Sequence, residues 1–172
     1  MAALIVLRIV HIGCAVFWAG GVMLMNFLVG PAIAAAGPEG FRVLQELSKR
    51  RYFHVILGAA ALTILSGLDL VRRDSGNFTP NWFHSPDGIG YSTGMIAAIV
   101  AFLIGLLAIN PALKRLGALG AEMMQAPAES RVAISAQVDA ARARLIAFGK
   151  VGTIFLVIAV VAMAAARYLR YL

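Results

Sequence analysis

The chain has 172 residues, of which 61% are hydrophobic and 13% are charged, and its formal net charge is +7. A water-soluble domain of this size cannot bury so much apolar surface, so the composition excludes an ordinary globular protein. No nucleic-acid-binding motif accompanies the basic residues. We therefore expect the lipid bilayer, and no nucleic acid, as their partner.

Four apolar runs are long enough to cross a bilayer, whose hydrocarbon core needs about 20 helical residues. They cover residues 3–29, 52–71, 92–113 and 145–166. Each run is apolar around its whole circumference, whereas a helix on a soluble core shows a polar stripe. The first run is too long for a signal peptide, and no cleavage site closes it. We predict an all-α fold, with four transmembrane helices forming an up-down bundle and residues 1–172 forming a single integral membrane domain.

The first run carries a face of chemically distinctive side chains. At about 100° per residue, five residues share this face: His11, Cys14, Trp18, Gly21 and Met25. Polar groups at membrane depth are costly and are therefore candidates for function, and this face has the donors that hold haem or copper. The alternative is that His11 donates a hydrogen bond to a neighbouring helix while the other residues only pack.

The depth of His11, about 10 Å from the outer surface by the helical rise, restricts its partners. His54 begins the second run at the opposite surface, so we exclude a haem bridged by His11 and His54. The chain has three histidines, which excludes a four-histidine, two-haem arrangement. Residues expected at the right depth are Thr63, Ser66, Met95, Met163 and, if the 72–91 loop folds inward, His84.

From these candidates we predict two overlapping ligand sets. A cofactor site would use His11 and Trp18, with Met163 or His84 as the second ligand, and a metal site would use His11, Cys14 and Met25. The cofactor would be haem b or copper. The alternative is that the protein has no cofactor, and the sequence identifies no catalytic residue.

Basic residues are concentrated in or beside the first and third loops: Arg42, Lys49, Arg50, Arg51, Lys114, Arg115, Arg131, Arg142, Arg144 and Lys150. The other side has half as many: Arg8, Arg72, Arg73, Arg167 and Arg170. The positive-inside rule then predicts that loops one and three are cytoplasmic. Both termini and the 72–91 loop would be periplasmic, in a bacterial-type inner membrane.

The two halves of the chain share an ordered pattern. Residues 29–33 (VGPAI) end the first run and residues 109–113 (INPAL) end the third, each with a proline that breaks or kinks the chain. This predicts two repeated helical hairpins. Loop three is the longer, and the spacing of Val132, Ile134, Val138, Ala141 and Leu145 suggests extended helical arms at the cytoplasmic face.

A family resemblance rests on the first 70 residues. Arg8 and His11 followed by Trp18, Ala19, Gly20 and Gly21, and then Arg50, Arg51 and Tyr52 leading into Ser66, Gly67 and Leu68, resemble the HemJ-type protoporphyrinogen oxidases and the copper-resistance protein D group. The resemblance implies a four-helix membrane fold with His11 as a haem or metal ligand. The start of the third run, Tyr91 to Met95, departs from the HemJ pattern, which has a lysine there.

Three functions follow as hypotheses. The first is a membrane protein that binds haem b or copper through the first helix, for electron transfer or for metal or haem handling. The second is a cofactor-free structural or accessory subunit, with a membrane-protein partner or a second copy of the chain. The third is a HemJ-like oxidoreductase acting on a porphyrin. The spanning runs hold no deeply placed carboxylate, which argues against a transporter.

Overall fold

The computed structural model describes residues 1–171, the side chains of Pro38 and Phe41 excepted, and all elements within this range are helical. In chain order they are α1 (Ala2–Leu24), η1 (Met25–Val29), α2 (Gly30–Ala35), α3 (Pro38–Lys49), α4 (Tyr52–Asp74), α5 (Pro80–Phe83), α6 (Pro86–Ile104), η2 (Gly105–Ile109), α7 (Asn110–Gln125), α8 (Ala128–Ala165) and η3 (Ala166–Tyr171). Four continuous helical segments are long and apolar enough to cross a membrane. The predicted all-α class and the four spans are confirmed.

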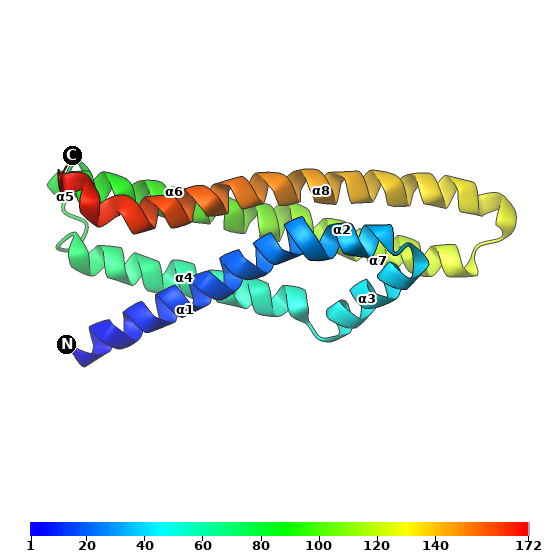
Figure 1. The fold of residues 1–172 in the computed structure, drawn as a ribbon, viewed down its shortest axis with the longest axis horizontal. Coiled ribbons are helices and arrows are strands. Elements are labelled where there is room, and N and C mark those ends of the chain that lie inside the picture. Colours follow the sequence, from blue (N-terminus) through cyan, green and yellow to red (C-terminus); the bar gives the residue numbers. More distant parts are fainter. Residues whose placement is uncertain (172) are drawn as a thin grey trace.

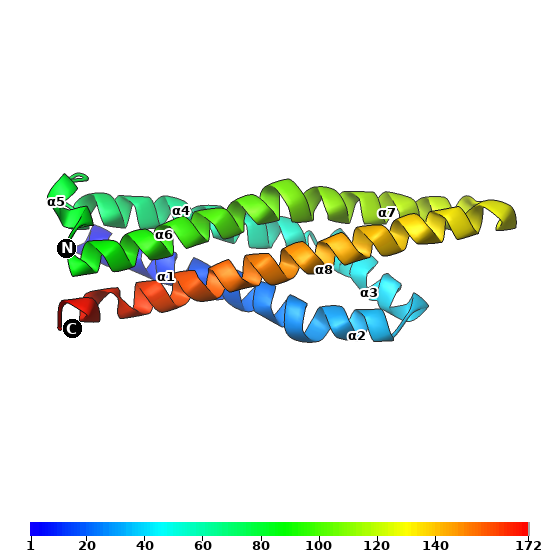
Figure 2. The ribbon, with the colours of Figure 1, turned by 90° about the horizontal axis from the view of Figure 1, so that it is seen from above.

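The long helices run roughly along one axis (Figure 1, Figure 2). Both termini and α5 lie at one end of the molecule, and the α2–α3 and α7–α8 turns lie toward the other. We call these the terminal end and the turn end. Helix α1 packs mainly on α4, and α6 packs mainly on α8. We refer to α1 with α4 as the first pair and to α6 with α8 as the second pair.

The core is shared by both pairs. Each of the four long helices contributes one buried side chain to the main apolar cluster, namely Trp18, Ala60, Ala101 and Leu156. Many large apolar side chains on the outside remain exposed, including Ile5, Leu65, Leu107 and Val161. An exterior of this kind is expected of helices that face lipid.

The second pair extends well beyond a bilayer. The continuous segment Pro86–Gln125 has 40 residues, and at about 1.5 Å per residue it is roughly twice as long as a ~30 Å hydrocarbon core is thick. The part of loop three predicted to form helical arms is indeed helical, and it has a core of its own, formed by Leu116, Leu119, Ile134 and Ala141. Val132 does not join this core and is 77% exposed, because a residue two positions from Ile134 points to another side of the helix.

Two spans begin earlier than the apolar runs suggest. Helix α6 starts at Pro86 instead of residue 92, and α8 starts at Ala128 instead of residue 145. For α6 the cause is local: the Ser85 hydroxyl accepts a hydrogen bond from Gly88 N–H, and Pro86 occupies the first helical position, where no N–H is needed. Asp87 in this first turn pairs with Arg170 of η3, which fastens the chain end to the start of α6.

The two prolines that end the predicted first and third runs do not break their helices. Each follows a π-helical turn, η1 before Pro31 and η2 before Pro111. In these turns Gly30 N–H donates to Met25 O, and Asn110 N–H donates to Gly105 O, one residue further back than in an α-helix. The wider turn accommodates the proline, which has no N–H and whose ring crowds the preceding turn, so the helix continues to Ala35 and to Gln125.

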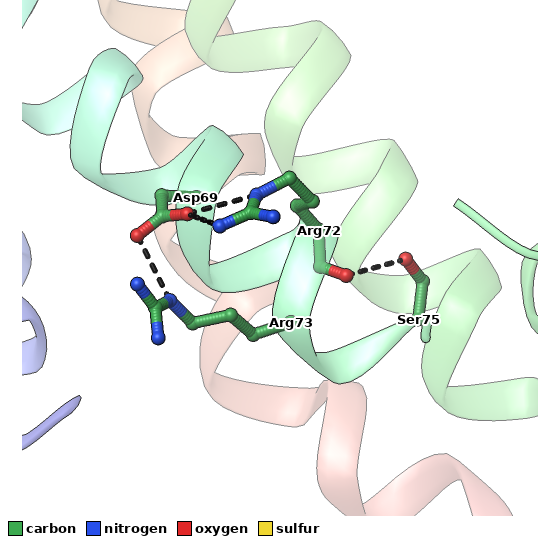
Figure 3. Close-up of polar contacts among 4 residues, drawn as sticks. All are labelled: Asp69, Arg72, Arg73 and Ser75. Atoms are coloured by element: carbon green, nitrogen blue, oxygen red, sulfur yellow. Dashed lines mark hydrogen bonds and ion pairs between the residues drawn. The ribbon is translucent and has the colours of Figure 1, made fainter. Parts of the chain in front are cut away.

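The charged groups at the terminal end of α4 are neutralised locally (Figure 3). Asp69 accepts hydrogen bonds from Arg72 (Nη2 at 2.7 Å) and from Arg73 (Nε at 2.9 Å). The Ser75 hydroxyl donates to Arg72 O and accepts from Phe78 N–H, which closes the helix end. Asp69 is thus held by two guanidinium groups, an arrangement unsuited to a proton relay.

Helix α3 at the turn end carries exposed ion pairs. Glu39 pairs with Arg42 and Glu46 pairs with Lys49, each one turn apart. The hydrogen bond and the charge of Lys49, with a further contribution from Arg50, hold the pKa of Glu46 below its usual value. Both acidic residues of this helix are thus paired within it, and Arg50 and Arg51 beside it have no ion pair among the described residues.

Candidate functional site

His11 lies at the contact between α1 and α4. Its Nδ1 is 2.8 Å from the main-chain oxygen of Thr63 and 3.3 Å from Ser66 Oγ. The Ser66 hydroxyl itself donates to main-chain oxygens of α4. Because a carbonyl oxygen only accepts, Nδ1 of the neutral imidazole carries the hydrogen, and Nε2 keeps a free lone pair. Nε2 has no hydrogen-bond partner within residues 1–171.

Glycine at position 67 makes room for this imidazole ring. A Cβ built on Gly67 would lie 2.8 Å from His11 Cε1 and 3.2 Å from His11 Nδ1, whereas carbon atoms in ordinary contact are about 3.5–4.0 Å apart. The ring therefore rests directly on the α4 backbone. Close approach at a small residue, together with a hydrogen bond across the helices, is a common way of joining membrane helices.

The other residues predicted on the His11 face also lie on the inner side of α1. Trp18 is 5% exposed and belongs to the main core. Cys14 and Met25 are half-buried. Gly21 receives the hydroxyl of Tyr52, which donates to Gly21 O over 2.9 Å.

Distance along the helix limits which of these residues share a ligand. Met25 follows His11 by fourteen residues, which corresponds to about 21 Å of helical rise, whereas metal–ligand bonds are about 2.0–2.3 Å long. His11 and Met25 cannot bind the same ion. His11 and Cys14 are one turn apart and share a side of α1. No group of three or more His, Cys, Asp or Glu residues within the described part of the chain is placed to hold a metal ion.

The candidates for a second ligand lie on other elements. Met163 of α8 is half-buried and packs against Gly94 of α6. His84 is exposed at the end of α5. The described contacts of His11 are with α4, whereas those of Met163 are with α6. No described contact brings the two side chains together.

A separate cavity lies between the two pairs, closer to the turn end. Its volume is about 130 Å³, and its walls come from all four long helices and from both π-helical turns. Its aromatic lining includes Trp18, Tyr52, Phe53 and Phe102, and its polar lining includes Asn26, His54 and Asn110. We call it the inter-pair cavity. His11 is not among its lining residues.

Asn26 is a polar residue at membrane depth that the sequence interpretation missed. Its amide group donates to Thr153 Oγ1 over 2.7 Å and to Gly149 O over 3.1 Å, which ties η1, the continuation of α1, to α8 of the second pair. The same reasoning that singled out His11, a polar side chain inside an apolar run, would have identified it.

Comparisons of the chain with protein-family models, with curated proteins and with solved structures found no match, so its function is inferred from its own residues.

Proposed function

We propose that this chain is a multi-pass protein of a bacterial-type inner membrane that binds haem b through His11 and serves electron transfer or haem handling. The observation that carries the proposal is the hydrogen bond from His11 Nδ1–H to the Thr63 carbonyl. Metal-ligating histidines almost always donate their other ring N–H to a carbonyl or carboxylate, which fixes the ring and leaves the remaining nitrogen basic.

Haem suits this histidine better than copper does. A protein copper site requires several ligands from side chains, and no such cluster of His, Cys, Asp or Glu surrounds His11 within the described residues. The porphyrin supplies four nitrogens to its iron, so one axial histidine is enough to hold haem. The iron would either be five-coordinate or take Met163 or His84 as its sixth ligand.

Orientation is part of the same proposal. The two basic loops lie toward the turn end, and both termini lie at the terminal end (Figure 1). With basic loops retained in the cytoplasm, the terminal end faces the periplasm. The recurrence of a π-helical turn two residues before Pro31 and Pro111 supports two repeated hairpins in an up-down bundle.

The test is an absorption spectrum of detergent-purified protein, oxidised and then reduced with dithionite, with total metal measured on the same samples. The wild-type protein should show a Soret band, and His11→Ala should lose it. Phe17→Ala is the matched control, because Phe17 lies on the same helix and is 51% exposed on its outer side; this variant should keep the band.

Other outcomes select the competing functions. Bound copper without a Soret band would indicate that the protein binds copper instead of haem. A colourless, metal-free wild-type protein would overturn the proposal and leave the cofactor-free accessory subunit, in which the His11 hydrogen bond only joins α1 to α4. A Soret band together with oxidation of a reduced porphyrin would indicate the HemJ-like activity.

A further inference from the structure

The inter-pair cavity contains hydrogen-bonding groups without a partner among residues 1–171. Trp18 is 5% exposed, yet its indole N–H has no acceptor among the described residues. The side-chain amide of Asn110 also has no partner in residues 1–171, whereas His54 is exposed at the start of α4. A donor at membrane depth without an acceptor is costly, so groups of this kind indicate a bound molecule or water.

The π-helical turn η1 adds an unsatisfied backbone group. In an α-helix the carbonyl of Asn26 would accept from Gly30 N–H, but that N–H donates to Met25 O instead. The next residue, Pro31, has no N–H to offer. The Asn26 carbonyl therefore has no donor in its own helix, and Asn26 lines the cavity. Irregular backbone inside a membrane protein is tolerated where it lines a cavity, and π-turns are frequent at functional sites.

The size and the walls of the cavity limit its occupant. Its volume is about 130 Å³, close to the roughly 150 Å³ of an apolar cavity that accepts one benzene ring. Pockets for drug-sized ligands measure about 300–1,000 Å³, so a porphyrin does not fit. Aromatic side chains, among them Trp18, Phe53 and Phe102, offer flat surfaces on which a single ring can stack.

We propose that the inter-pair cavity binds the head group of a quinone. A quinone is a flat six-membered ring with two carbonyl acceptors on an apolar tail, and it reaches a protein through the bilayer. The cavity would hold the ring, and the other ring substituents and the tail would extend out of it between the helices. The two carbonyls of the quinone match the free donors of Trp18 and Asn110. Trp18 belongs to α1, and Asn110 begins α7, which continues α6, so the ligand would join the first pair to the second.

The two tryptophans of the chain provide the assay, since Trp18 lines the cavity and Trp82 lies in α5. Trp82→Phe leaves Trp18 as the sole tryptophan, and Trp18→Phe leaves Trp82. We expect decylubiquinone to quench the fluorescence of Trp18 saturably, whereas Trp82 should show only the linear quenching of a quinone dissolved in the detergent micelle.

A donor-deletion variant tests the recognition itself. In the Trp82→Phe background, Asn110→Leu should weaken decylubiquinone binding by about three- to tenfold, the worth of one hydrogen bond. Asn81→Leu is the matched control, because Asn81 is exposed in α5. This variant should bind decylubiquinone with unchanged affinity. His11→Ala should also bind as before, so loss of haem and loss of quinone binding are separate results.

Three results would overturn the proposal. The first is equal, non-saturable quenching of the two tryptophans. The second is saturable quenching that Asn110→Leu leaves unchanged, which would mean that the quinone binds without this donor and so outside the proposed site. The third is quenching of Trp18 by a phospholipid with a brominated acyl chain that decylubiquinone does not relieve, which would mean that a lipid tail fills the cavity.

Discussion

Replacing Gly67 with alanine tests the contact between His11 and α4. The new Cβ would lie 2.8 Å from His11 Cε1, so the ring must move by about 1 Å to restore an ordinary carbon contact. Overpacking of this kind costs about 1–3 kcal/mol. The movement also disrupts the bond from Nδ1 to Thr63 O, and a hydrogen bond between membrane helices is worth about 0.6 kcal/mol.

The matched control is Gly58→Ala, on the same helix, where a Cβ meets nothing within 4 Å. Both variants gain the helix propensity of alanine, about 1 kcal/mol, so this gain cancels between them. Gly67→Ala should therefore be less stable than Gly58→Ala by about 2–4 kcal/mol. The assay is unfolding in mixed detergent micelles with increasing dodecyl sulfate, followed by circular dichroism. Equal stabilities, within about 0.5 kcal/mol, would refute the packing of His11 on Gly67.

Three further outcomes are expected. Asn26→Leu removes two hydrogen bonds to α8 and should lower the free energy of unfolding in the same assay by about 1 kcal/mol. An unchanged unfolding midpoint would contradict these hydrogen bonds. Gly90→Ala places a Cβ 2.7 Å from the Cα of Ala166, a backbone atom that cannot rotate away, so it should cost about 1–3 kcal/mol, whereas Gly20→Ala, with open space, should not. Alkaline phosphatase fused to the C-terminus should be active, since we place that end in the periplasm; activity of a fusion in the α7–α8 turn instead would reverse the orientation.

The number and type of spans could be predicted because they depend on composition within one segment. An uninterrupted apolar run of about 20 residues has few alternatives to a membrane helix. The ends of the helices could not be predicted from apolarity, since α6 begins at a serine cap and a proline outside its apolar run. The helical arms of loop three were predicted from the spacing of their apolar residues, although one of these residues, Val132, is exposed.

The prolines show a second limit. Pro31 and Pro111 predicted a break or a kink. Neither proline breaks its helix, because a π-helical turn before each proline redirects one hydrogen bond. Such a turn leaves no mark in the hydrophobic period, which is the primary signal in a sequence. Both turns also line the inter-pair cavity.

The candidate site was partly accessible from the sequence. The inward face of α1 follows from helical periodicity, and the alternative role of His11 as a donor to a neighbouring helix is what the structure displays at Nδ1. The acceptor, the Thr63 carbonyl, is a backbone atom and carries no sequence signal. The cavity likewise depends on how four helices meet, which no single segment encodes.

The most direct test of the account is the haem content of the purified wild-type protein, measured as haem b per chain and repeated for His11→Ala. We predict about one haem per chain in the wild-type protein and none in the variant, because a single axial histidine is proposed to hold it. Wild-type protein without haem, or haem that His11→Ala retains in full, would contradict the assignment of His11 as its ligand.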